Sequence, residues 1–85
     1  MYKITFKDSA SKELQRLSKS VIKKIVFSIN ELSENPRPNG VKKLKDSNEN
    51  LYRIRVGDYR IIYVIDDGIK IVNIRRIGHR KDIYR

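Results

Sequence analysis

The 85-residue sequence predicts an α+β fold with the element order β-α-α-β-β-β, in which two N-terminal helices pack on one face of a mainly antiparallel, four-stranded twisted sheet. One alternating segment and two helical repeats of apolar residues occupy the first half of the chain. Three β-rich runs separated by short turns occupy the second half. A chain of this length supports one core, so we expect a single domain over residues 1–85.

The first three elements follow from the spacing of apolar side chains. Residues 2–7 alternate apolar and polar side chains, which predicts a strand with one buried face. Asp8 or Ser9 can then cap a short helix. Ser20 can cap a longer helix, because the apolar residues within 22–32 form one stripe at helical spacing.

The second half of the chain reads as a loop followed by a three-stranded meander. Residues 35–40 contain two prolines and a glycine and therefore end the second helix. Residues 41–50 are rich in lysine, asparagine and acidic side chains, which predicts an exposed loop. Residues 51–56, 59–66 and 69–77 are rich in β-branched and aromatic side chains, and the short turns between them each contain aspartate and glycine.

The basic residues are many and unevenly distributed. The formal net charge is +10, which attracts polyanions. Residues 1–50 hold nine lysines and two arginines, whereas residues 51–85 hold seven arginines and two lysines. Because the planar guanidinium binds phosphate through two parallel hydrogen bonds, we expect phosphate chemistry in the C-terminal half.

Several classes of site and location are disfavoured by composition. The chain has no cysteine and one histidine, and its acidic residues are scattered, so neither a disulfide nor a metal site is expected, nor any other cofactor. There is no glycine-rich phosphate loop. The N-terminus lacks the long apolar run of a signal peptide, and no stretch reaches membrane-spanning length, which predicts a cytoplasmic protein without membrane contact.

Three arginines of the predicted meander are candidates for a binding surface. Alternation puts Arg53 and Arg55 on the strand face opposite its apolar residues, and Arg60 is the one basic residue in the next, otherwise hydrophobic run. One interpretation is structural: Arg53 and Arg55 form a solvated face, and Arg60 pairs with Asp58 or Asp66. The other is that the three guanidinium groups converge on a phosphate.

The C-terminal residues 78–85 carry a second group of candidates. A glycine hinge precedes His79 and Arg80, and Tyr84 follows, which are chemical groups suited to phosphoryl transfer. Alternatively, the segment frays and is basic for solubility, with His79 as a surface side chain and Tyr84 as a hydrophobic anchor.

Together these blocks resemble the RelE/ParE superfamily of toxins from toxin-antitoxin systems, and specifically its RelE-type ribonuclease branch. The resemblance covers nearly the whole chain and is carried by Lys43-Leu44 ahead of a loop, by residues 51–63 and by residues 78–85. The gyrase-poisoning ParE branch shares the fold and much of the middle block, but generally lacks the catalytic set of the tail.

The resemblance implies an endoribonuclease, an mRNA interferase that enters the ribosomal A site beside ribosomal RNA and is held inactive by an acidic RelB-like antitoxin. It implies a monomeric toxin or a toxin-antitoxin hetero-oligomer. The candidate catalytic residues are Arg60, Arg80, Tyr84 and His79, and the candidates for RNA or phosphate binding are Arg53, Arg55, Lys43, Lys81 and Arg85.

The implied chemistry needs no metal, because RNA carries its own nucleophile. The 2′-hydroxyl must be aligned and deprotonated and the phosphorane stabilised, which yields a 2′,3′-cyclic phosphate. Arg53 and Arg55 occupy positions that are often lysine in the best-known members, and arginine is the poorer proton acceptor. The general base and acid therefore remain open among His79, Arg80 and Tyr84. Two other functions stay in view: a ParE-like gyrase inhibitor and a non-enzymatic basic nucleic-acid-binding module.

Overall fold

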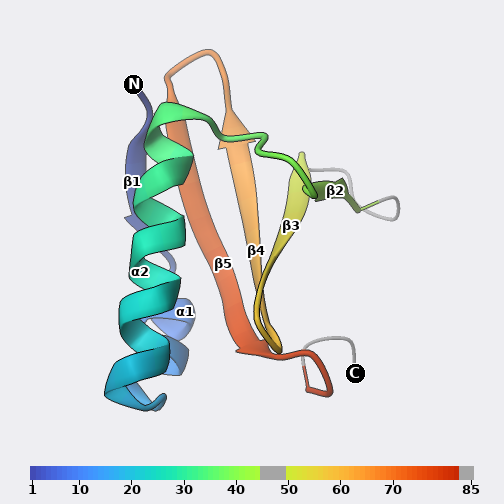
Figure 1. Ribbon diagram of the computed structural model, residues 1–85. Coiled ribbons are helices and arrows are strands. Elements are labelled where there is room, and N and C mark those ends of the chain that lie inside the picture. The colour runs from blue at the N-terminus through green and yellow to red at the C-terminus, as the bar shows by residue number, and fades with distance from the viewer. Residues whose placement is uncertain (45–49, 83–85) are drawn as a thin grey trace.

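Two helices pack on one side of a twisted, five-stranded sheet in the computed structural model, which describes residues 1–44 and 50–82 (Figure 1). The elements are β1 (Lys3–Phe6), α1 (Asp8–Gln15), α2 (Lys19–Glu34), β2 (Lys42–Lys43), β3 (Leu51–Val56), β4 (Tyr59–Asp66) and β5 (Ile71–His79). The strand order is β1-β5-β4-β3-β2, with β1 parallel to β5 and the other neighbours antiparallel. The α+β class and the helix placement are confirmed, whereas the predicted number of strands was one too few.

The additional strand, β2, lies where an exposed loop was expected. Lys42 pairs with Arg53 and Lys43 with Tyr52 at the edge of the sheet, and the Leu44 amide donates to the Leu51 carbonyl at 2.9 Å. A strand of two residues is too short to show an alternation pattern. Its conformation is set by its pairing with β3, which the local sequence does not reveal.

The helix starts also differ from the predicted caps. The hydroxyl of Ser18, not Ser20, accepts a hydrogen bond from the Val21 amide at 3.4 Å, and α2 begins one residue after this cap. Lys7 precedes α1 without a side-chain cap, and Asp8 lies in the first turn, where its charge favours the helix N-terminus.

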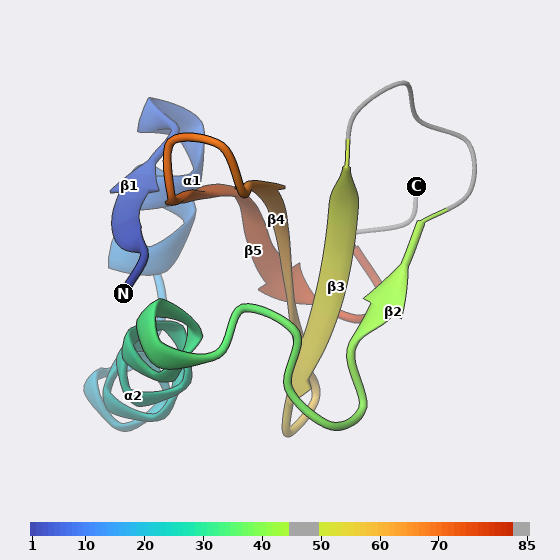
Figure 2. The ribbon, with the colours of Figure 1, turned by 90° about the horizontal axis from the view of Figure 1, so that it is seen from above.

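The core lies between the helices and the inner face of the sheet. Figure 2 shows α2 beneath the part of the sheet formed by β1, β5 and β4, while β3 and β2 extend beyond it. The helices bury Ala10, Ile25, Ile29 and Leu32 against Tyr52, Ile54, Ile61, Tyr63, Ile65, Val72, Ile74 and Ile77. Each large side chain buried here contributes about 1.5–3 kcal/mol relative to an exposed one. Among the described residues, neither helix is both long and apolar enough to cross a membrane.

The turn between β4 and β5 is longer than expected, so β5 begins at Ile71 and not at residue 69. The Asp66 carboxylate accepts hydrogen bonds from the amides of Gly68 and Ile69 at 3.0 and 3.1 Å. Lys70 then takes a left-handed conformation, with φ at +58°. These contacts hold the chain in a turn for two more residues before strand pairing starts.

The far end of β5 continues past its predicted end at residue 77. Ile74 is the last residue of β5 that pairs with β1. The strand then bulges by one residue opposite Ile62 and Tyr63, and its pairing with β4 continues as far as His79. The Glu13 carboxylate accepts from the Ile77 amide at 3.0 Å, and so binds a strand edge that β1 does not reach. Gly78 and His79 therefore belong to the sheet and do not form a hinged tail.

A hydrogen-bonded network joins the segment after α2 to the β4–β5 turn. Arg37 binds the Asp67 carboxylate at 2.9 and 3.2 Å, stacks over Tyr52 and donates to its hydroxyl, while the Tyr2 hydroxyl donates to Asp67 at 2.6 Å. The hydrogen bonds from Arg37 and then Tyr2 lower the pKa of Asp67 to about 2. Burial raises the pKa of the Tyr63 phenol, whose hydroxyl donates to the Pro36 carbonyl at 2.8 Å.

Candidate nucleic-acid interface

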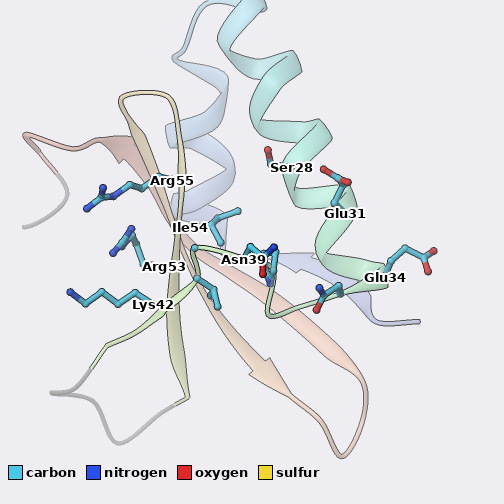
Figure 3. Close-up of a pocket in the computed structure, with 12 residues that line it drawn as sticks. Ser28, Glu31, Glu34, Asn39, Lys42, Arg53, Ile54 and Arg55 are labelled. Atoms are coloured by element: carbon cyan, nitrogen blue, oxygen red, sulfur yellow. The ribbon is translucent and has the colours of Figure 1, made fainter.

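The strand register brings three arginines onto the face of the sheet that α1 and α2 do not cover. Arg55 pairs directly with Arg60 across β3 and β4, and Arg53 lies two residues away on the same face. The residues that alternate with them are buried against the helices. In Figure 3 the side chains of Arg53 and Arg55 point away from α2, and Lys42 points the same way. We call Lys42, Arg53, Arg55 and Arg60 the sheet cation cluster.

Arg53 is the buried member of this cluster. Its residue is 6% exposed, and its Nε has no hydrogen-bond partner among the described residues. Its neighbours across the strands are Lys42 and Ile62, so neither supplies an acceptor or a negative charge. A guanidinium nitrogen in this position is costly unless an anion reaches it. Phosphate oxygens meet that need in charge and geometry.

Arg60 lies near the hairpin end of β4, on the face that the helices do not cover and opposite a position without a side chain. It is half-buried, and its cross-strand partner on β5 is Gly78. Because Gly78 has no side chain, β5 places none of its own directly opposite Arg60. Of the two acids considered as its structural partners, Asp66 directs its carboxylate to the amides of its own turn.

The C-terminal candidates separate when the chain leaves β5. Arg80 is exposed, and its amide donates to the Asp58 carbonyl at 2.9 Å, which holds its backbone against the hairpin that joins Arg55 and Arg60. His79 pairs with Tyr59, so its ring lies on the opposite face of the sheet from Arg60. Lys81 is exposed in the following turn. Tyr84 and Arg85 lie outside the described residues.

Lys42, and not the predicted Lys43, lies on the same face as the three arginines. Lys43, a predicted phosphate-binding residue, pairs with Tyr52 and so lies on the face that carries the core. Lys42, which was not predicted, pairs with Arg53 and lies with the sheet cation cluster. Alternation would have separated the two lysines only if this segment had been recognised as a strand.

A cavity of about 710 Å³ lies on the other side of β3 from the cluster. Ser28, Glu31 and Glu34 line it from α2, and Figure 3 shows Ile54 pointing toward it from β3. Arg53 and Arg55 border this cavity while their side chains point away from it. The charged groups of Lys42, Arg53 and Arg55 therefore lie on the other side of β3 from this cavity.

The chemistry available at the cluster is cationic. Within residues 1–44 and 50–82, no three histidine, cysteine or acidic side chains lie close enough together to hold a metal ion. Two acids of this part of the chain form ion pairs elsewhere, Glu13 with Arg76 and Asp67 with Arg37. The cluster can bind and polarise a phosphate through guanidinium and ammonium groups.

Comparison with known proteins finds toxins that share this sequence pattern and fold. A family model described as the ParE toxin of type II toxin-antitoxin systems, parDE, matches residues 4–84. The toxins RelE and RelG of Mycobacterium tuberculosis are 38% and 35% identical to the chain, each over 85 residues; the match covers 99% of this chain in both cases and 87% and 97% of those proteins. The RelE-RelB complex of Pyrococcus horikoshii aligns with a TM-score of 0.83 and 29% identity over 95% of this chain and 97% of that one. A family match over nearly the whole chain and relatives of this identity show that the protein belongs to the RelE/ParE superfamily of toxins from toxin-antitoxin systems.

Proposed function

We propose that this toxin is an endoribonuclease of the RelE type, which cuts messenger RNA in the ribosomal A site, in the cytoplasm and without a metal ion. The observation that carries the proposal is the pairing of Arg55 with Arg60 beside the buried Arg53 on the uncovered face of the sheet. Curated relatives named RelE and RelG support the RelE branch. A face built this way suits an RNA backbone, because its charges are fixed by strands before the substrate arrives.

In the proposed reaction, Arg60 and Arg80 bind the scissile phosphate and stabilise the charge that develops on its oxygens. Arg60 lies on β4 beside the β3–β4 hairpin, and the Arg80 amide donates to the Asp58 carbonyl in the same hairpin. Loss of one such donor slows related chemistry by about 10²–10³-fold. Tyr84 orients the nucleotide. One proton leaves the 2′-hydroxyl and one is delivered to the departing 5′-oxygen; Tyr84 is the candidate to accept the first, and Arg80, which is always charged, can only donate the second.

Arg53, Arg55 and Lys42 then hold the flanking backbone of the RNA. Arg53 gains most from this contact, because a phosphate oxygen would accept from its buried Nε. Lys81 and Arg85 contribute long-range attraction from the end of the chain, and Lys43 contributes it from the opposite face of β2.

The partner that restrains the toxin would be an acidic antitoxin. The relative from Pyrococcus horikoshii forms a complex with RelB, which supports a toxin-antitoxin hetero-oligomer here as well. We infer that an acidic segment of the antitoxin competes with RNA for the sheet cation cluster. Binding that is unchanged by added salt and by charge reversal at Arg53, Arg60 and Arg80 together would refute this electrostatic competition.

The direct test maps messenger ends after brief expression of the toxin, by primer extension. The wild type should produce new ends within coding sequences, and Arg60→Ala should lose them. Arg16→Ala is the matched control, because it removes the same charge from an exposed position at the end of α1. The upstream fragments should end in a 2′,3′-cyclic phosphate, which mass spectrometry detects. A free 3′-hydroxyl would exclude attack by the 2′-hydroxyl.

Inhibition of DNA gyrase is the second candidate, because the matching family model is described as a ParE toxin. It predicts DNA breaks and a DNA-damage response with intact messengers in the same cells. A third possibility, a binding module without chemistry, predicts that Arg80→Ala lowers activity only in proportion to RNA affinity. The ribonuclease predicts a loss of turnover that exceeds the loss of affinity.

A further inference from the structure

His79 closes the end of β5 on the side of the sheet that faces away from Arg60. Its cross-strand partner is Tyr59, and the two rings meet edge to face, with centroids 5.5 Å apart and planes at 78°. The residue that pairs with Arg60 is Gly78, one position earlier, and side chains of successive strand residues point to opposite faces. The His79 ring is thereby held against Tyr59, with the strand backbone between it and the sheet cation cluster.

The same ring closes the turn that follows β5. The Lys81 amide donates to His79 Nδ1 at 3.2 Å, and the Asp82 amide donates to the His79 carbonyl at 2.8 Å. A side-chain acceptor bound to the amide two residues later is the arrangement that asparagine and aspartate make in an Asx turn. An Nδ1 that accepts a hydrogen bond carries no proton, so this contact can be made only by an imidazole whose proton is on Nε2.

Arg80 lies between His79 and Lys81, the two residues joined by the hydrogen bond to Nδ1. Its own amide is tied to the Asp58 carbonyl at 2.9 Å, so the residue is fixed on one side by the β3–β4 hairpin and on the other by the turn closed through His79. Arg80 is exposed, and without such restraints a residue beyond the last strand would sample many backbone conformations.

We propose that His79 is a positioning residue: its Nδ1 closes the turn over residues 79–82 and fixes Arg80 beside the hairpin, and it does not transfer a proton to or from RNA. The part that concerns Arg80 and phosphate rests on the proposed ribonuclease function. The closure of the turn does not rest on it. The geometry favours this role over general acid or base catalysis, because Nδ1 is occupied and the ring is on the face opposite Arg60.

Three substitutions separate positioning from proton transfer. His79→Asn keeps a side-chain oxygen that can accept from the Lys81 amide and removes the titratable ring. His79→Phe keeps a ring against Tyr59 and removes the acceptor. His79→Ala removes both. We expect His79→Asn to retain most of the cleavage rate in the primer-extension assay. His79→Phe and His79→Ala should be slower by up to about 10²-fold, the cost of a catalytic group displaced by about 1 Å.

A readout that does not depend on activity is the hydrogen exchange of the Lys81 amide, measured by NMR on the full chain. We expect this amide to exchange up to about tenfold faster in His79→Phe and His79→Ala than in the wild type, as the loss of one hydrogen bond implies. His79→Asn should keep the slow exchange. The Ile77 amide, bound to Glu13, serves as an internal reference that stays unchanged in all three variants.

Two results would overturn the proposal. If His79→Asn lost cleavage as fully as His79→Ala while the Lys81 amide stayed protected, the imidazole would be a proton donor or acceptor. If Lys81 exchange were the same in His79→Ala and the wild type, the turn would not depend on the ring. Failure of the ribonuclease function is distinguishable, because the wild type would then cut no messenger, while the exchange pattern would still decide whether His79 closes the turn.

Discussion

Arg55 and Arg60 are paired directly across β3 and β4, on the face of the sheet opposite the side chains that pack against the helices. Like charges in this relationship destabilise a sheet by roughly 0.2–1 kcal/mol. Arg53, two residues along β3, adds a third guanidinium that is almost fully buried. Such a pairing is what we expect of the phosphate-binding surface proposed above, since stability alone favours neutral or opposite charges at paired positions.

The first prediction concerns this repulsion. Arg55→Gln should raise the free energy of unfolding by up to about 1 kcal/mol, because it removes the charge opposite Arg60 and keeps a long polar side chain. The same substitution should weaken binding to a short single-stranded RNA. Urea denaturation measures the first effect and fluorescence anisotropy the second.

Arg16→Gln provides the control, since it makes the same exchange at an exposed site at the end of α1. Both its unfolding free energy and its RNA affinity should match the wild type. A less stable Arg55→Gln protein would show that the two arginines do not repel each other in the folded sheet.

The second prediction concerns the buried guanidinium. Arg53→Met replaces a residue that is 6% exposed with an apolar one of similar length, so it should leave stability unchanged or raise it by about 1 kcal/mol or more. If Arg53 binds an RNA phosphate, the slope of the logarithm of affinity against the logarithm of salt concentration should become shallower by about 0.7.

Lys23→Met, on the exposed side of α2, is the comparison for that slope. It should leave the salt dependence of RNA binding as it is in the wild type. Equal slopes for Arg53→Met and the wild type would mean that Arg53 does not contact the RNA backbone.

The three long strands and both helices could be predicted from the sequence because each carries a local signal. Strands β3 and β4 begin and end at the predicted residues, since the aspartate-glycine turns around them set the pairing. Strand β2 carries no such signal, because its two lysines are held only by pairing with β3. The same lack of a local signal hid the extension of β5 to His79, which depends on pairing with Tyr59.

The candidate site was predictable to the same extent. Alternation was enough to place Arg53 and Arg55, since they alternate with apolar residues along β3. Arg60 lies in a run that is apolar on both faces, so its position opposite Arg55 comes from the strand register. The sequence did not show that His79 and Arg60 lie on opposite faces of the sheet. That arrangement depends on β5 continuing through Gly78 and His79, because Gly78 then pairs with Arg60 and the side chain of His79 points to the other face. Whether Tyr84 joins Arg60 stays a prediction, as Tyr84 lies outside the described residues.

The third prediction concerns acid. Hydrogen bonds from Arg37 and then Tyr2 lower the pKa of Asp67 to about 2, against an ordinary value of about 3.9. Between these values the unfolded chain binds more protons at this site than the folded chain, so acid favours unfolding. The stabilisation from Asp67 is complete above about pH 4 and is lost as the pH falls toward 2. Thermal unfolding at a series of pH values should show this loss.

Asp67→Asn should remove that part of the pH dependence and lower the melting temperature at pH 7. Glu34→Gln, an exposed carboxylate at the end of α2, should retain the wild-type pH profile. If Asp67→Asn and the wild type lost stability in parallel between pH 4 and pH 2, the contacts from Arg37 and Tyr2 would not stabilise the ionised form.

The fourth prediction separates stability from binding. The Tyr63 ring is fully buried, and its hydroxyl donates to the carbonyl of Pro36, itself a buried residue, at 2.8 Å. Tyr63→Phe leaves that carbonyl without its donor, so the free energy of unfolding should fall by about 1–3 kcal/mol. Tyr52→Phe should cost less, because the Tyr52 hydroxyl is a partly buried acceptor at 3.3 Å from Arg37 Nε.

Neither tyrosine substitution should change RNA affinity at a temperature where both proteins are folded. The hydroxyl of Tyr63 bonds to the segment after α2, on the inner face of the sheet, whereas the sheet cation cluster lies on the outer face. Urea denaturation and fluorescence anisotropy on the same samples provide the two measurements. A Tyr63→Phe protein that is as stable as the wild type would show that the Pro36 carbonyl finds another donor, and weaker RNA binding would show that the two faces of the sheet are coupled.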